Sequence, residues 1–397
     1  MLKYFVEIMA KTTKEFSFLD LDKELSKING FETGSILSEN TFSEVDEWIP
    51  TGNYLLNAQL SGTLFGGIPN TRSLGLMGDP GTGKSFVCLN VAREAQKKGY
   101  DVIYCDTEGA IDKSSAIKFG IDANKVRYQP IKTVTEFQTF VANLLELVKK
   151  AKANGANPKI LLILDSLGML STDKELRDAI EGKNAADMGA KAKELRKLFR
   201  VITLDLTAAK IPLVCTNHVY AGGGYIPTKE SSGGDGPIFA MSVISFLSKA
   251  QLKEGNSTTK TGIIVTSNLK KSRFTIPEPV KFHISFLNGM NPYVGLQEFV
   301  SWEACGIGRG KLEEVKNSKG EKEMVFTPSE SAQARWAIKH LGKTITSSQL
   351  FTPEVFTEDV LRQLDDNVIK KHFILPSMGS NDEITNALEA DFDDEQE

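Results

Sequence analysis

Short apolar runs alternate with amphipathic stretches along residues 72–287. The apolar runs are rich in β-branched residues and end in a polar one, as in 101–106 (DVIYCD) and 159–165 (KILLILD). Between these runs, apolar residues recur at helical spacing, as in 135–153 and 191–210. Strands that alternate with helices in this way predict an α/β fold, a mostly parallel sheet covered by helices on both faces.

The same pattern gives the remaining elements of this region. A helix is expected at 85–98, and further strands are expected at 73–78, 211–217, 240–250, 261–270 and 280–286. Polar turns rather than helices separate the last three strands, which predicts an antiparallel extension of the sheet. With 41% hydrophobic residues, the chain can bury a sizeable core around such a sheet.

Composition and charge restrict where the protein acts. No apolar run approaches the ~20 residues that cross a bilayer, and the first residues show no signal-peptide cleavage pattern. We therefore expect a cytoplasmic protein without a membrane partner. Residues 381–397 hold eight acids and no Lys or Arg, whereas the residues before them hold 43 acids and 47 bases. Such a tail is usually solvated, although it can also mimic nucleic acid and compete for a basic groove.

The stretch 77–86 (MGDPGTGKSF) contains Gly78-x-x-x-x-Gly83-Lys84-Ser85, the pattern of a phosphate-binding loop. It follows a predicted strand and opens a predicted helix, as this pattern requires. Its glycines let backbone N–H groups point at phosphates beside the positive end of the helix, and Lys84 supplies a cation to the β- and γ-phosphates. The residues expected to bind ATP here are Gly78, Asp79, Pro80, Gly81, Thr82, Gly83, Lys84, Ser85 and Phe86.

Acidic residues follow two of the predicted strands. Asp165 ends the apolar run ILLILD and is the expected partner of the Ser85 hydroxyl in holding Mg²⁺. Glu108 lies just past the strand 101–106, where a carboxylate can polarise water for attack on the γ-phosphate. Asp106 is the competing candidate for that role.

Two further segments carry features that ATP hydrolysis alone does not require. Basic residues recur at helical spacing within 171–200: Lys193, Arg196, Lys197 and Arg200. A charged helix face of this kind is often only solvated. Residues 219–237 combine glycines with Tyr220, Tyr225 and Lys229. This composition suits either a loop that contacts single-stranded DNA or a disordered connector, and His218 at its base would sense the γ-phosphate.

Six stretches together resemble the core of the RecA-family strand-exchange recombinases, most of all those of T-even phages. In chain order they are GDPGTGKS, YCDTEGAID, LLILDSLGML, PLVCTNH, GGDGP and NLKKSR, within residues 49–299. The resemblance implies that residues 171–188 and 220–236 form two DNA-contacting loops, and that His218 couples the second loop to ATP. It also implies that Lys271 and Arg273 reach the ATP of a neighbouring protomer.

The resemblance assigns roles to individual residues. The implied catalytic residues are Glu108, Lys84, Lys271, Arg273 and His218. Asp112 and Asp165 join the implied nucleotide-binding residues. The implied DNA contacts are Arg177, Lys183, Lys193, Arg196, Tyr220, Gly223, Tyr225, Ile226, Lys229, Gly233 and Gly234. The family often has a tyrosine that stacks on adenine where this chain has Ser115, so no residue is assigned to the base.

The resemblance also implies an organisation and an activity. The expected parts are an N-terminal oligomerisation segment (1–48), a RecA-like ATPase core (49–299), a small C-terminal α+β domain (300–380) and an acidic disordered tail (381–397). The expected activity is ATP hydrolysis, with Mg²⁺, coupled to DNA strand exchange in recombination, repair and replication.

The expected partners are single-stranded DNA, duplex DNA, further copies in a head-to-tail helical filament, a recombination mediator and a single-stranded-DNA-binding protein. A ring helicase built on the same core is the alternative function, and a small-molecule phosphotransferase is a more distant one.

Overall fold

The computed structural model describes residues 17–28, 37, 42–183, 188–221, 229–231, 241–253, 259–316, 322–331 and 333–374. The chain falls into two compact units, residues 1–45 and 46–397. The first unit holds α2 (Phe18–Leu25), whose start is closed by a capping box between Ser17 and Asp20. The other elements given below belong to the second unit. The domain boundaries expected from the sequence stay predictions.

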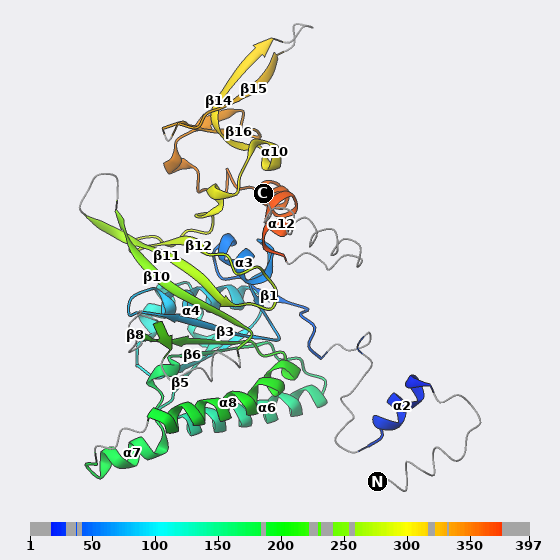
Figure 1. Ribbon diagram of the computed structural model, residues 1–397, viewed down its shortest axis with the longest axis vertical. Coiled ribbons are helices and arrows are strands. Elements are labelled where there is room, and N and C mark those ends of the chain that lie inside the picture. Colours follow the sequence, from blue (N-terminus) through cyan, green and yellow to red (C-terminus); the bar gives the residue numbers. More distant parts are fainter. Residues whose placement is uncertain are drawn as a thin grey trace, which may run out of the picture. The chain divides into compact units, whose positions relative to one another are not determined.

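A nine-stranded sheet forms the centre of the second unit, in the order β13-β12-β11-β10-β3-β7-β6-β4-β5 (Figure 1). The parallel strands are β10 (Val243–Lys253), β3 (Ser73–Gly78), β7 (Leu213–Asn217), β6 (Ile160–Asp165), β4 (Asp101–Asp106) and β5 (Val126–Pro130). The antiparallel strands are β11 (Lys260–Lys271), β12 (Val280–Ser285) and β13 (Gly289–Met290). The predicted parallel sheet with an antiparallel extension is therefore confirmed.

Side chains that alternate along the buried strands divide the core into two layers. Leu161 and Ile163 of β6 join the cluster that contains α4 (Lys84–Lys97). Leu162 and Leu164 point the other way and join the cluster of α6 (Val134–Ala153) and α8 (Met188–Ala209). The helices α6 and α8 lie side by side under one face of the sheet (Figure 1). Both faces of the sheet are covered, as the continuous apolar runs predicted.

Shorter elements complete the second unit. The other helices are α3 (Tyr54–Ser61), α5 (Lys113–Lys118), α7 (Asp173–Ile180), α10 (Trp302–Cys305), α11 (Glu358–Leu364) and α12 (Lys370–Phe373). Two antiparallel pairs are β1 (Trp48–Ile49) with β2 (Ile68–Pro69), and β8 (Val219–Ala221) with β9 (Lys229–Ser231). A small antiparallel sheet has the order β15 (Lys322–Pro328), β14 (Ile307–Lys316), β16 (Trp336–Ile338) and β17 (Lys343–Ile345). Among the described helices, none is long and apolar enough to cross a bilayer.

The segment 171–188, expected as a loop, includes the helix α7. The Thr172 side chain accepts a hydrogen bond from the backbone N–H of Glu175, and the Glu175 side chain accepts one from Thr172 N–H. This capping box satisfies two backbone donors that a helix start otherwise leaves unpaired. The predicted loop is thus wrong for these two turns, and the pattern Thr-x-x-Glu is its sequence signal.

A buried carboxylate ties the C-terminal helices to the region after α3. Asp365 is 2% exposed and lies between α11 and α12. Its Oδ1 accepts a hydrogen bond from Leu64 N–H at 2.7 Å, and its Oδ2 accepts one from Thr63 Oγ1 at 2.6 Å. Lys370 Nζ lies 3.4 Å from Oδ2 and compensates the charge. The helices after residue 357 are therefore anchored to the segment that follows α3.

Replacing Asp365 by Ala should destabilise the protein by ~1–3 kcal/mol, because a buried N–H and a hydroxyl lose their acceptor. The neighbouring Asp366 provides a matched control, since it also pairs with Lys370, at 2.6 Å, but is exposed. Asp366→Ala should change the free energy of unfolding by less than about 1 kcal/mol. Urea unfolding of both variants measures the difference, and equal midpoints would contradict the anchoring role.

Candidate functional site

Polar residues follow four parallel strands at the same edge of the sheet. The loop 78–85 follows β3, and Glu108 follows β4. Ser166 follows β6, and His218 follows β7. Because these strands are parallel, their carboxyl ends meet at one edge, which is where α/β sheets bind ligands. The structure therefore brings the predicted nucleotide loop together with two of the predicted catalytic residues, Glu108 and His218.

The loop 78–85 has the shape of a phosphate cradle. Gly81 (φ 72°) and Gly83 (φ 89°) adopt left-handed backbone conformations, and a Cβ on Gly83 would lie 2.6 Å from Ile284 Cδ1. Lys84, the first residue of α4, is 6% exposed, and its Nζ donates to the carbonyl oxygens of Gly78 at 2.9 Å and Asp79 at 3.1 Å. Burial lowers the pKa of Lys84, while the nearby carboxylates of Asp165 and Glu108 oppose that effect. A buried ammonium at a helix N-terminus fits an anionic phosphate.

Three other predicted nucleotide residues have structural contacts in this conformation. Thr82 Oγ1 donates to the carbonyl oxygen of Asp79 at 2.9 Å and closes the loop. The Phe86 ring packs edge-on against Phe119, with centroids 4.8 Å apart. Asp112 caps α5 by accepting a hydrogen bond from Ser115 N–H at 2.7 Å.

Asp165 is held rigidly at the end of β6. Tyr104 of β4 donates its hydroxyl to Oδ2 at 2.7 Å, and Thr216 of β7 donates to Oδ1. Burial raises the pKa of Tyr104 far above its usual value, so this residue remains a donor. Carboxylate and hydroxyl oxygens are the ligands that suit a hard cation. The described residues include no cluster of three or more His, Cys, Asp or Glu that could hold a metal ion.

The structure separates the roles of Asp106 and Glu108. Asp106 is 2% exposed, and its Oδ1 accepts hydrogen bonds from Glu108 N–H at 2.9 Å and Gly109 N–H at 2.8 Å. Its Oδ2 accepts hydrogen bonds from Ile111 N–H at 3.3 Å and Tyr128 Oη at 3.2 Å. With both oxygens occupied, Asp106 shapes the turn that carries Glu108. The geometry therefore favours Glu108 as the carboxylate that meets water.

Glu108 lies in a small polar group at the site. Its Oε1 accepts a hydrogen bond from Ser166 Oγ at 2.7 Å and lies 3.1 Å from His218 Nε2. Its side chain remains 34% exposed. Burial would raise the pKa of Glu108, but the hydrogen bonds from Ser166 and His218 outweigh it and hold the pKa below its usual value. Glu108 is therefore ionised near neutral pH.

Lys271 and Arg273 lie toward the opposite edge of the sheet. Lys271 pairs with Ile244 of β10, which in turn pairs with Gly75, so it sits level with the first half of β3. Arg273 lies near Arg72, the residue before β3. Burial and the Arg273 charge lower the pKa of Arg72 and of Lys271. These three side chains form a cationic cluster away from the phosphate loop of their own chain.

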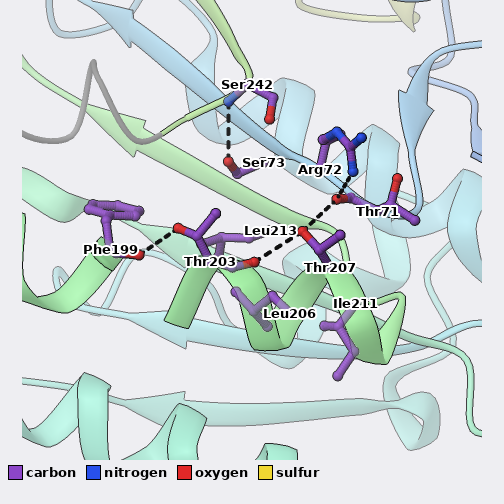
Figure 2. A pocket seen from close by; sticks show the side chains of 10 residues that line it. All are labelled: Thr71, Arg72, Ser73, Phe199, Thr203, Leu206, Thr207, Ile211, Leu213 and Ser242. Carbon is purple, nitrogen blue, oxygen red and sulfur yellow. Dashed lines mark hydrogen bonds between the residues drawn. The ribbon is translucent and has the colours of Figure 1, made fainter. Parts of the chain in front are cut away.

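Figure 2 shows the beginning of β3, where Arg72 and Thr71 line a cavity of about 20 Å³ beside α8. The cavity has room for about one water molecule. Thr207 of α8 donates its hydroxyl to the carbonyl oxygen of Thr71 at 3.1 Å. This hydrogen bond joins helix α8 to the segment just before β3, beside the cationic cluster.

The predicted DNA contacts are only partly described. Arg177 and Lys183 are exposed, in and just after α7, and Lys183 pairs with Glu181 at 2.5 Å. Lys193 and Arg196 are exposed on α8, while Leu195 and Leu198 of the same helix face the core. Tyr220 and Lys229 lie in the strands β8 and β9. Gly223, Tyr225, Ile226, Gly233 and Gly234 lie outside the described residues.

Several residues of the site were not singled out from the sequence. Tyr104 and Thr216 place hydroxyls beside apolar residues of the strands β4 and β7, and these hydroxyls were the available sequence signal. The hydrogen bond from Ser166 to Glu108 had no signal of its own, because it joins residues 58 positions apart.

Comparisons with known proteins agree with this geometry. The family model of the RecA N-terminal domain matches residues 20–291. The chain is 28% identical over 284 residues to the recombination and repair protein of Enterobacteria phage T4, covering 70% of this chain and 69% of that protein. It is 28% identical over 264 residues to protein RecA of Fusobacterium nucleatum (65% of each chain). It is 26% identical over 275 residues to protein RecA of Wolinella succinogenes (68% of this chain and 73% of that one).

Replacing Ser166 by Ala should raise the pKa of Glu108, because the carboxylate loses a hydrogen bond that stabilises its charged form. If ATP hydrolysis requires ionised Glu108, the acidic limb of its pH profile should move to higher pH. The rate near pH 8 should change less than the rate near pH 5. Ser114→Ala, which removes an exposed hydroxyl from α5, is the control. Superimposable profiles for the two variants would show that Ser166 does not tune Glu108.

Proposed function

The chain belongs to the family of the RecA N-terminal domain, and from this premise we propose that it is an ATP-dependent DNA strand-exchange recombinase. One observation carries the proposal: His218, which contacts Glu108 at 3.1 Å, is also the residue from which the glycine-rich segment 219–237 begins. A segment that contacts DNA would therefore begin at the residue next to His218, which contacts Glu108 in the ATP site. The recombination and repair protein of phage T4 is the relative whose name supports this reading.

Each residue of the site has a role in this proposal. The loop amides and Lys84 bind the phosphates of ATP, and Ser85 and Asp165 are the residues that would hold Mg²⁺. Bound Mg²⁺ neutralises charge that develops on the phosphates. Glu108 polarises the attacking water, and Asp106 and Ser166 fix its position. DNA contacts on the segment 219–237 act on Glu108 through His218.

The cationic cluster supports a site completed by a second copy of the chain. Lys271 and Arg273 lie level with the start of β3, whereas the phosphate loop leaves its end, at Gly78. Two cations that cannot serve their own chain's nucleotide are well placed to serve a neighbour's. A head-to-tail contact whose rotation does not close builds an open helical filament, which is the assembly that we propose. The segment 1–48, with its amphipathic helix α2, is the proposed docking element.

The partners follow from this activity. Single-stranded DNA, homologous duplex DNA and further copies of the chain take part in strand exchange itself. A recombination mediator and a single-stranded-DNA-binding protein are the proposed accessory partners. The similarity to a phage protein supports the cytoplasm of an infected bacterium as the place of action.

Single-stranded DNA should stimulate ATP hydrolysis by at least ~10-fold, since the DNA-contacting segment leads directly to the group that holds Glu108. Steady-state hydrolysis with and without DNA measures the effect. Electron micrographs with DNA and a non-hydrolysable ATP analogue should show open filaments. Closed rings would favour a helicase, and a rate indifferent to DNA would favour a small-molecule phosphotransferase.

Mixing two inactive variants should restore part of the activity. Lys84→Ala damages the site that receives the cations, and Lys271→Ala removes a cation that is donated to a neighbour. In a mixed filament, some interfaces combine an intact Lys84 with an intact Lys271, so DNA-dependent hydrolysis should partly recover. Lys270→Ala, a change at the neighbouring exposed position, should hydrolyse ATP nearly normally by itself. Absence of any recovery would argue that Lys271 acts within its own chain.

A further inference from the structure

The strand β10 runs on beyond the point where β3 ends. Leu247 pairs with Gly78, the last residue of β3, and β10 continues to Lys253. Lys249 is two residues past Leu247 and therefore projects from the same face of the sheet. Because Leu247 packs against Gly78, Lys249 lies beside the phosphate loop.

The Lys249 ammonium rests on the outer part of that loop. Its Nζ donates to the carbonyl oxygen of Pro80 at 2.7 Å. A Cβ on Gly81 would lie 2.7 Å from the same nitrogen. The side chain is exposed, and no acidic partner of Lys249 is found in the described part of the chain. The cation is thus positioned by the loop backbone rather than by an ion pair.

Lys249 and Lys84 approach the loop from different sides but bind it in the same way. Lys84 comes from α4 and donates to the carbonyls of Gly78 and Asp79, and Lys249 comes from β10 and donates to Pro80. An ionised phosphate oxygen is a stronger acceptor for an ammonium than a neutral carbonyl. Both ammonium groups would therefore form a stronger hydrogen bond to a bound phosphate than to the loop carbonyls.

We propose that Lys249 is a second cation that the chain supplies to its own nucleotide, binding an oxygen of the terminal phosphate of a nucleoside triphosphate. The inner phosphates lie against the amides at the start of α4. The outer part of the loop, at Pro80 and Gly81, is left to face the terminal phosphate. This inference rests on the proposed ATP-dependent function and extends it with a residue that the loop motif does not contain.

Lys249 also follows the proposed DNA-contacting segment 219–237 in the chain. The segment 219–237 begins after His218, which contacts Glu108, and β10 is the next strand of the central sheet after it. In the sequence, His218, which contacts Glu108, therefore stands before this segment, and Lys249, which contacts the phosphate loop, stands after it.

Equilibrium binding of ATPγS, ADP and AMP to the full chain, without DNA, tests the role of Lys249. Lys249→Met keeps much of the side-chain volume and removes the charge, so ATPγS affinity should fall by ~10-fold, the loss of one charge-assisted contact. AMP affinity should stay within about twofold, and ADP should lose less than ATPγS. Lys249→Arg should restore most of the ATPγS affinity. Lys281→Met, an exposed lysine of β12, should bind all three nucleotides as the unchanged protein does.

Two outcomes would overturn the inference: unchanged ATPγS affinity in Lys249→Met, or an equal loss for ATPγS and AMP, which would indicate a general distortion of the loop. Thermal unfolding of the variant shows whether such a distortion is present. A different result would contradict the proposed function: the unchanged protein binds ATPγS, but single-stranded DNA does not change its rate of ATP hydrolysis. Normal DNA stimulation together with unaltered binding in Lys249→Met would reject only the role of Lys249.

Discussion

The pairing of β3 with β7 on one side and β10 on the other determines what can reach the phosphate loop. A loop that leaves the end of a central strand is flanked by the ends of both neighbours. On the β7 side these are Asn217 and His218, with Asp165 one strand further along. On the β10 side the neighbouring strand does not end, and it carries Lys249 past the loop. The nucleotide site therefore has a carboxylate side and a cationic side.

Asp106, the last residue of β4, and Glu108, just after it, show how the same chemical group is given different tasks. Asp106 is buried, and four hydrogen bonds occupy its oxygens, so it is a structural anchor for the turn. Glu108 is partly exposed and holds its charge through Ser166 and His218. A base must be ionised and must reach water, and of these two residues Glu108 meets both conditions. Because His218 stabilises the charge of Glu108, any movement of His218 changes the basicity of the proposed catalytic group.

The sequence predicted the central sheet well because its strands are buried on both faces and its helices have long apolar stripes. The run ILLILD forms the buried strand β6, and the family indicated by the six motifs is confirmed. The edge strand β5 was not anticipated, since its residues VRYQP are mostly polar and half exposed. The capping box of α7 was overlooked within a segment taken as a loop.

The parts of the candidate site that lie within one short stretch of sequence were predictable, and the contacts between distant stretches were not. The phosphate loop is one continuous motif, and Asp165 and Glu108 follow strand ends that could be read directly. Contacts such as Tyr104 with Asp165 and Thr216 with Asp165 depend on which strands become neighbours and in what register. Register cannot be read from one strand alone. For the same reason Lys249 had no signal, since it lies 169 positions from Pro80.

Cations at both edges of one sheet explain why hydrolysis and assembly belong together in the proposed function. In this proposal, Lys84 and Lys249 come from the chain that binds the nucleotide and favour binding whether or not a neighbour is present. Burial and the charge of Arg273 lower the pKa of both Arg72 and Lys271, so Arg273 repels these two cations within one chain. An anionic triphosphate on the adjacent copy would relieve this repulsion. Assembly then stabilises the cationic cluster and the nucleotide together, and loss of the terminal phosphate on hydrolysis weakens the same contact.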